Sequence, residues 1–305
     1  MLKHGDLVIL VNPKGKRYLR RAEAGEEISN NDGVMAMDDV LAAGFGGVVR
    51  TRQGVPYKVM RPGLNELLKG VKRQTQIIYP KDISYLCLRL GAGNGRRIIE
   101  AGSGSGSLTL GLSWFSGERG QVYTYEARTE FYELCRKNLA WAGLGHNVTQ
   151  HNRDIVDGFV EKDVDALFLD VRTPWEYLDQ ALAALAPGGQ LAFLVPTVDQ
   201  LSQLLRAFET RPIDEPEVLE ILMRRWKPVA DRLRPEDRMI SHIGSLVFAV
   251  KQEQCAEWDA QRPLGTRERK QEAAREARLA AAREDSQDTA ATDHVAFDDF
   301  TTHEV

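Results

Sequence analysis

The stretch Arg97-Ile-Ile-Glu-Ala-Gly-Ser-Gly-Ser-Gly-Ser-Leu-Thr109 decides the fold. A short apolar segment runs into a turn with glycine at every second position, and the turn opens a helix. Glycine lets the backbone turn tightly and approach a ligand closely. Such a loop after a strand is typical of nucleotide-cofactor sites, although a tight structural turn can use the same residues.

The glycine spacing narrows the class of cofactor. Dinucleotide-binding loops carry G-x-G-x-x-G and place a pyrophosphate on a helix N-terminus. Here the pattern is G-x-G-x-G, preceded by Glu100. This variant suits a cofactor without phosphate, with the loop wrapped around the amino-acid part of S-adenosylmethionine. The loop residues expected to bind it are Gly102, Ser103, Gly104, Ser105, Gly106, Ser107 and Leu108.

Downstream, strand-like and helix-like segments alternate. Short apolar segments cover residues 97–100, 121–126, 148–151, 166–170 and 190–195, and helical spacing covers 129–142 and 177–185, where Pro187-Gly-Gly189 ends it. Alternation of this kind predicts an α/β fold with a parallel sheet covered on both faces. Two later apolar stretches, 217–223 and 244–250, lie too close to the end of this region for another full α/β repeat, and we expect them to pair as an antiparallel hairpin on the sheet edge.

Three carboxylates follow predicted strands, where ligands of open α/β sheets bind. Glu126 comes about 20 residues after the glycine-rich loop and is placed to accept from both ribose hydroxyls. Asp154 suits the adenine amino group of the cofactor, or alternatively the N-cap of a helix over residues 155–160. Asp170 would face the methyl-transfer point, beside both cofactor and substrate. Trp175 or Tyr79 is suited to stack on a base, and Trp175 is equally suited to the core.

Residues 1–70 predict a small β-rich domain. The apolar run Leu7–Val11 stops at the turn signal Asn12-Pro-Lys-Gly15, and further glycine-rich breaks follow. The segment from Lys14 to Arg21 is strongly basic. It suits a solvated hairpin, or an arm that contacts phosphates.

Charge is unevenly spread along the 305 residues. The net charge is −4, but residues 252–305 hold 7 Lys/Arg and 13 Asp/Glu, whereas residues 1–251 hold 33 and 31. Residues 1–251 are therefore nearly neutral, so the negative charge of the whole chain is no argument against nucleic-acid binding by this part. The tail, residues 252–305, reads as a charged helix that leads into a disordered acidic end. We expect a cytoplasmic protein without a membrane segment, and no metal, because three scattered cysteines and six histidines form no ligand motif.

Three segments together resemble the tRNA (adenine-58-N1)-methyltransferase family, over about residues 1–250. Arg73-Gln-Thr-Gln-Ile-Ile-Tyr-Pro-Lys-Asp-Ile83 is similar to a family segment just before the first strand. The stretch Glu100–Gly106 matches the cofactor motif. Asp-Val-Arg-Thr-Pro-Trp at 170–175 matches the motif D-[LM]-P-x-P-W, with one departure, because Arg172 replaces the usual proline. This departure concerns loop shape and substrate contacts more than the chemistry.

The resemblance implies a class I methyltransferase domain at residues 71–251, behind the small β domain. It implies S-adenosylmethionine as cofactor, tRNA as partner and a homotetramer. The residues it assigns to the cofactor are the loop 102–108, Glu126, Asp154, Gln76 and Asp170. Asp170 is then the catalytic acid, while Gln76 and Tyr79 lie on a segment that closes over the pocket.

Two rival functions stay open. The same loop would serve a methyltransferase acting on a small molecule or a protein carboxylate. Alternatively, the chain is a non-catalytic tRNA-binding subunit, although such a subunit should have lost the glycines or the acids that are present here. For the favoured function we expect N1 of adenine to attack the methyl carbon directly, with ionised Asp170 stabilising the cationic ring. The target base, buried in folded tRNA, must first be extruded.

Overall fold

The N-terminal part of the chain forms an antiparallel sheet in a computed structural model. The sheet has the order β2-β1-β6-β5, with β1 at Leu7–Val11, β2 at Arg17–Arg21, β5 at Val48–Arg50 and β6 at Pro56–Met60. A hairpin of β3 (Glu27–Asn30) and β4 (Gly33–Ala36) leads into α1 (Met37–Ala43). Side chains on the inner faces form a core of their own that includes Val8, Leu10, Val40 and Tyr57. The β-rich expectation for this region is therefore confirmed.

The structure describes residues 1–74, 76–237, 239, 243–253, 255–257, 269 and 271–277. The chain divides into two units, Met1–Gln254 and Cys255–Val305. In the second unit, residues 271–277 are helical and exposed, within the expected helix. The acidic end, 285–305, lies outside the described residues, and the expected boundaries at residues 70 and 251 stay predictions.

A mixed sheet of seven strands forms the centre of the first unit, in the order β12-β15-β11-β10-β7-β8-β9. The strands are β7 Arg97–Ala101, β8 Gln121–Tyr125, β9 Val148–His151, β10 Val164–Leu169, β11 Leu185–Val195, β12 Ile213–Leu219 and β15 Ser245–Lys251. Strands β7 to β11 pair in parallel. Strand β15 pairs antiparallel with both β11 and β12.

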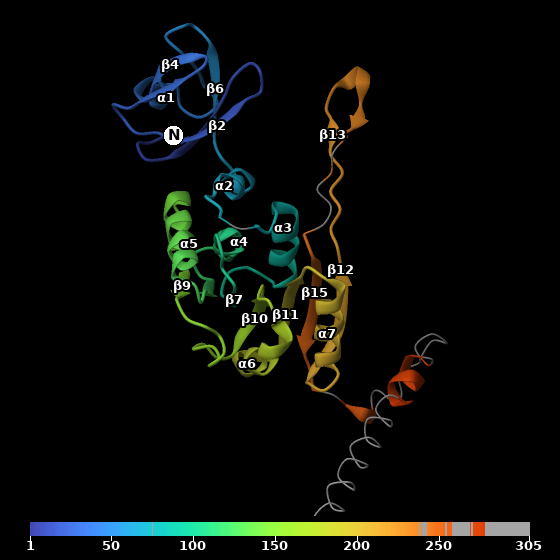
Figure 1. Ribbon diagram of the computed structural model, residues 1–305. Helices are drawn as coiled ribbons and strands as arrows, with labels where there is room; N and C mark the ends of the chain where they lie inside the picture. The colour runs from blue at the N-terminus through green and yellow to red at the C-terminus, as the bar shows by residue number, and fades with distance from the viewer. Residues whose placement is uncertain are drawn as a thin grey trace, which may run out of the picture. The chain divides into compact units, whose positions relative to one another are not determined.

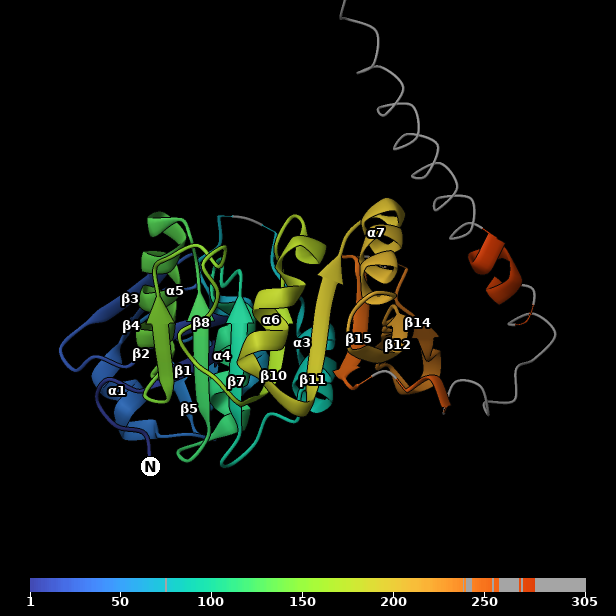
Figure 2. The ribbon, with the colours of Figure 1, turned by 90° about the horizontal axis from the view of Figure 1, so that it is seen from below.

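Helices cover both faces of this sheet (Figures 1 and 2). Alternate strand residues point to opposite faces, so Ile98 joins a core with α2 (Leu64–Gly70), α3 (Pro80–Arg89), α4 (Ser107–Ser116) and α5 (Thr129–Ala142). Ile99 joins a second core with α6 (Leu178–Ala184) and α7 (Val198–Phe208). The α/β fold class is confirmed, and parallel strands place their carboxyl ends at one edge.

Several local predictions were wrong. Pro187-Gly-Gly189 does not end a helix, because α6 stops at Ala184 and β11 runs through these residues, with an irregular register against β10. Helix α7 lies between β11 and β12 and completes a further α/β repeat, for which we had expected too little sequence. Strands β12 and β15 do pair antiparallel as expected, although β12 ends at Leu219. Residues 155–160 form no helix; they include turns and bends.

Between β12 and β15 the chain extends as an arm (Figure 1). The arm carries the short antiparallel pair β13 (Trp226–Lys227) and β14 (Arg234–Pro235), joined by a 3-10 turn. Large apolar side chains are exposed along it: Leu222, Met223, Trp226, Val229 and Leu233. No helix in the described part of the chain is long and apolar enough to cross a membrane.

Candidate active site

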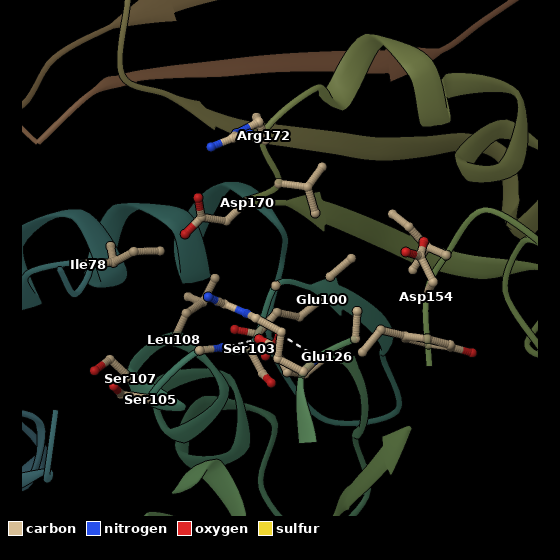
Figure 3. A pocket seen from close by; sticks show the side chains of 18 of the residues that line it. Ile78, Glu100, Ser103, Ser105, Ser107, Leu108, Glu126, Asp154, Asp170 and Arg172 are labelled. Carbon is tan, nitrogen blue, oxygen red and sulfur yellow. Dashed lines mark hydrogen bonds and ion pairs between the residues drawn. The ribbon is translucent and has the colours of Figure 1, made fainter. Parts of the chain in front are cut away.

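Loops at the carboxyl ends of β7, β8, β9 and β10 surround one cavity of about 520 Å³ (Figure 3). The glycine-rich loop forms one wall, and the loop that follows β10 lies across from it. Residues 76–78, which precede α3, also line the cavity. A cavity of this size is typical of a small-molecule or cofactor site.

The glycine-rich loop depends on glycine at two positions. Gly102 has a φ of +92°, and a Cβ there would lie 2.2 Å from the backbone oxygen of Asp170. Gly106 has a φ of +79°, and a Cβ there would lie 2.7 Å from Sγ of Cys135 in α5. Gly102 therefore allows β7 and β10 to approach, while Gly106 allows α4 to pack on α5. Gly106 does not line the cavity, although the other six predicted loop residues do.

Three serine hydroxyls in this loop are buried without a hydrogen-bond partner among the described residues: Ser103, Ser105 and Ser107. All three residues line the cavity. Buried polar groups in native proteins nearly always have a partner. The orphaned hydroxyls therefore fit a polar ligand that the loop would wrap.

Glu126 ties the second strand to the glycine-rich loop. It is 6% exposed, and its Oε2 accepts from the backbone N–H of Gly104 at 3.0 Å. Its Oε1 accepts from the backbone N–H of Arg128 at 3.1 Å and pairs with the guanidinium of Arg128 at 3.3 Å. A carboxylate oxygen accepts more than one hydrogen bond, so Glu126 still has capacity for ribose hydroxyls.

Two further carboxyls titrate near neutrality. Burial, together with the charge of Glu126, raises the pKa of Asp170 to about 7. Burial likewise raises the pKa of Glu100 to about 7, although the hydroxyls of Thr109 and Thr124 donate to its Oε2 at 2.6 and 2.8 Å and oppose the rise. Shifts of this size cluster at functional sites. The acids repel one another, so a cation in the cavity would favour their charged forms.

The other predicted site residues divide between several places. Gln76 and Asp154 line the cavity, and both are exposed. Instead of capping a helix, Asp154 accepts from the backbone N–H of Val156 at 2.9 Å. Tyr79 lines a different cavity, between α2, α3 and the arm. Trp175 packs against the core on the α6 and α7 face and does not line the cavity.

Sequence reasoning missed several lining residues. One of them is Arg172, which had been noted only as a departure from the motif. The others that line the cavity are Ile77, Ile78, Tyr125, Arg128, Arg153, Ile155, Val171 and Tyr177. Most of them directly follow the end of a strand or adjoin a predicted site residue, and that position was the available signal. Tyr177 lies seven positions after Asp170 and had no signal of this kind.

A polar network holds the loop that carries Asp154. The Tyr125 hydroxyl donates to Glu161 and accepts from the backbone N–H of Val160 at 2.9 Å. His151 stacks on the Tyr125 ring at 4.5 Å and contacts Glu161 through Nε2 at 2.9 Å. Because Tyr125 also lines the cavity, the network links the far end of this loop to the site wall. His151 thus has a structural contact.

Comparisons with solved structures agree with this architecture. A tRNA (m1A58) methyltransferase TrmI from Aquifex aeolicus superimposes with a TM-score of 0.73 at 37% identity, over 83% of this chain and 99% of that chain. An SAM-dependent O-methyltransferase from Thermotoga maritima superimposes with a TM-score of 0.79 at 39% identity, over 83% and 96%.

Sequence relatives point the same way. The tRNA (adenine(58)-N(1))-methyltransferase TrmI of Thermus thermophilus is 34% identical over 241 residues, which are 79% of this chain and 94% of that protein. The tRNA (adenine(57)-N(1)/adenine(58)-N(1))-methyltransferase TrmI of Methanocaldococcus jannaschii is 30% identical, over 79% and 93%. The family model for the tRNA methyltransferase complex GCD14 subunit matches residues 60–302. The chain therefore belongs to this tRNA methyltransferase family, as its sequence motifs had indicated.

Proposed function

We propose that this protein transfers a methyl group from S-adenosylmethionine to N1 of adenine 58 in tRNA, the reaction named for its Thermus relative. The observation that carries the proposal is Asp170. Its carboxyl group lines the same cavity as the glycine-rich loop and Glu126, so an acid lies beside the place where the cofactor would bind. An ionised carboxylate there would stabilise the positive charge that N1 methylation creates on the adenine ring.

The cavity fits S-adenosylmethionine on the chemistry of its walls. The unpartnered hydroxyls of Ser103, Ser105 and Ser107 suit the amino-acid part, and the Glu126 carboxylate suits the ribose. Asp154 lies on the loop that follows β9 and suits the adenine amino group. When bound, the cofactor supplies a methyl group activated by its sulfonium. Acidic walls favour that cation over the neutral thioether that remains after transfer.

The residues of this chain then stabilise charge. N1 would form the new bond to the methyl carbon through its in-plane lone pair while the carbon–sulfur bond breaks. The leaving group would be a neutral thioether, and the positive charge would lie on the adenine ring. Ionised Asp170 accepts a hydrogen bond from the 6-amino group and stabilises that ring. One preorganised group of this kind typically contributes about 3–4 kcal/mol, or roughly 10²–10³ in rate. The transfer itself needs no proton acceptor.

The charge state of Asp170 depends on its ligands. In the protein alone its raised pKa, about 7, leaves a substantial fraction protonated at neutral pH. A sulfonium near the carboxyl group stabilises the ionised form by Coulomb attraction. Cofactor binding would therefore prepare Asp170 for its acceptor role.

We infer a homo-oligomer, a tetramer by resemblance, held in part by the arm between β12 and β15. Trp226 is 56% exposed, Val229 53% and Leu233 64% on this arm. A second copy of the chain would bury these apolar side chains. Light scattering of the purified protein tests the assembly, and Trp226→Glu should shift it toward smaller species.

Contact with tRNA is proposed for the N-terminal sheet as well. On the edge strand β2, Arg20 lies over the Tyr18 ring at 5.9 Å, and Lys16, just before the strand, lies over the same ring at 5.2 Å. Arg17 pairs with Glu66, and Arg21 donates to the backbone oxygens of Gly5 and Trp141. The basic segment thus forms a hairpin in which Arg21 has a structural role. Arg20 donates through one nitrogen to the backbone oxygen of Leu19 at 2.8 Å, and its other donors and Lys16 remain available for phosphates. A cytoplasmic location stays a prediction.

A different acceptor is the second candidate, because the Thermotoga structure is described as an O-methyltransferase. The two are separated by incubating the purified chain alone with methyl-labelled S-adenosylmethionine and an unmodified tRNA transcript. Label recovered as 1-methyladenosine at position 58 supports the proposal, and a transcript with guanosine at that position is the control. Cofactor binding without label in tRNA would point to another acceptor. Activity of the chain alone would exclude a purely non-catalytic role.

A further inference from the structure

The departure from the family motif, Arg172, lies at the cavity that holds Asp170. It lines this cavity and is exposed. In Figure 3 the side chains of Asp170 and Arg172 leave the same loop and point to the same side of the view, where Ile78 also lies. A guanidinium and the acid therefore project from one loop on the same cavity wall.

The loop that carries Arg172 is held by hydrogen bonds that leave the side chain free. Gln200, in the first turn of α7, donates from Nε2 to the backbone oxygen of Arg172 at 2.9 Å. The Thr173 hydroxyl donates to Glu176 at 2.7 Å, and the backbone N–H of Glu176 returns to the Thr173 oxygen at 3.0 Å. The backbone is thus held at the carbonyl of Arg172 and at the next residue, while the side chain takes no part in these bonds.

Arg172 differs from the two other arginines that line the cavity. Arg128 pairs with Glu126 and stacks on Phe131 at 3.9 Å. Arg153 donates through Nε to the backbone oxygen of Asp154 at 3.4 Å. Among the described residues, the Arg172 guanidinium has no hydrogen bond or ion pair. Its donors are therefore free for a ligand.

The ligand must be an anion that reaches the transfer point. The sulfonium and ammonium groups of the cofactor are cations, which a guanidinium repels. The carboxylate of the cofactor belongs to the amino-acid part, which the serines of the glycine-rich loop on the opposite wall suit. An extruded nucleotide, by contrast, carries a phosphate on each side of its base. The planar guanidinium fork matches a phosphate in two-point geometry.

We propose that Arg172 is a substrate-binding residue that engages a phosphate flanking the target nucleotide. This inference rests on the proposed function, because it takes tRNA as the substrate. It gives the departure from the usual motif a role in holding the extruded nucleotide. Arg172 acts on substrate binding, whereas Asp170 acts on the chemical step.

The test compares Arg172→Met, which keeps a side chain of similar reach without charge, with Arg119→Met. Arg119 is exposed at the amino end of β8, the edge away from the cavity, so the control also removes one charge. Affinity for unmodified tRNA transcript is measured at several salt concentrations, with KM, kcat and cofactor affinity. Arg172→Met should weaken tRNA binding about tenfold and flatten the salt slope by about one counterion. Cofactor affinity should stay within about twofold, and Arg172→Lys should recover part of the loss.

A chemical substitution on the RNA locates the contact. A ligated tRNA carries a neutral methylphosphonate on the 5′ or the 3′ side of the target adenosine. One of these should weaken binding to the wild-type protein and leave the Arg172→Met variant unaffected, since coupled partners are not additive. Additive losses at both positions would overturn the inference.

Other outcomes are equally decisive. Equal tRNA affinity and salt slope for the Arg172 and Arg119 variants would contradict the contact. Selective loss of cofactor affinity would assign the guanidinium to the cofactor carboxylate instead. If the wild type binds tRNA through Arg172 but forms no 1-methyladenosine, the reaction proposal fails and the phosphate contact stands. A wild type that does not bind tRNA would refute both.

Discussion

The loop after β7 and the loop after β10 face each other across one cavity, yet they are held in different ways. The β7 loop is set by backbone geometry, because Gly102 approaches the Asp170 backbone and Gly106 packs against Cys135. The β10 loop is set by side chains, through Gln200, Thr173 and Glu176. A loop fixed by side chains tolerates a new residue such as Arg172. We infer that the β7 loop maintains cofactor binding, while the β10 loop adjusts substrate binding.

The largest effect is expected for Asp170→Asn, a substitution in the β10 loop. Loss of the negative charge should lower kcat by about 10²–10³, because the cationic ring loses its preorganised acceptor. Cofactor affinity should fall much less than kcat, since the β7 loop and Glu126 remain and only the attraction between Asp170 and the sulfonium is lost. Single-turnover methylation and calorimetric titration of cofactor separate the two effects. Full turnover in this variant would remove Asp170 from the mechanism.

A backbone change should break the β7 loop instead. Gly102→Ala brings a methyl group to within 2.2 Å of the Asp170 oxygen at a φ of +92°. Overpacking and backbone strain together should cost about 2–4 kcal/mol in the free energy of unfolding and weaken cofactor binding. Chemical denaturation measures the cost. Gly143→Ala is the matched control, because its φ is +69° and nothing lies within 4 Å of the added atom. Equal losses at both sites would show that the close approach is unimportant.

The pH dependence of methyl transfer tests whether Asp170 acts in its ionised form. A carboxyl group accepts the proposed hydrogen bond only when ionised, and the raised pKa of Asp170 is about 7. The value of kcat/KM for S-adenosylmethionine, which reports the cofactor-free enzyme, should therefore fall as pH drops below about 7, approaching tenfold per unit. Asp170→Asn should be flat in this range. A wild-type profile that is flat down to pH 5 would contradict the shifted carboxyl group.

The smallest expected effect comes from Thr173→Ala, in the side-chain framework of the β10 loop. The variant loses the hydrogen bond to Glu176. An exposed bond of this kind contributes at most about 1 kcal/mol. We expect a two- to fivefold rise in KM for tRNA, with kcat and cofactor affinity unchanged, as measured by steady-state kinetics. An unchanged KM would mean that the position of Arg172 does not depend on the hydrogen bond between Thr173 and Glu176.

Local patterns predicted the elements that carry the site. Helix α5 and strand β9 have the expected bounds, and the strands that end near Glu126 and Asp170 lie within a residue or two of expectation. Apolar periodicity and glycine spacing are properties of neighbouring residues, so sequence displays them directly. The arrangement around Pro187 was not predictable in this way. There, β11 begins at Leu185, pairs with β10 on both sides of Pro187-Gly-Gly189, and takes up these residues as an irregularity in its register.

The amino-acid sequence by itself determined the cofactor loop, the alternation of strands and helices between β7 and β11, and the acids at strand ends. These acids share one edge because parallel strands bring their carboxyl ends together. Only the tertiary structure decided which other side chains meet there. It placed Tyr79 in a different cavity, packed Trp175 against the core and brought Tyr177 and Arg172 to the cavity wall. The physical reason is that side-chain convergence depends on loop paths set by long-range packing and hydrogen bonds, such as that of Gln200 to Arg172.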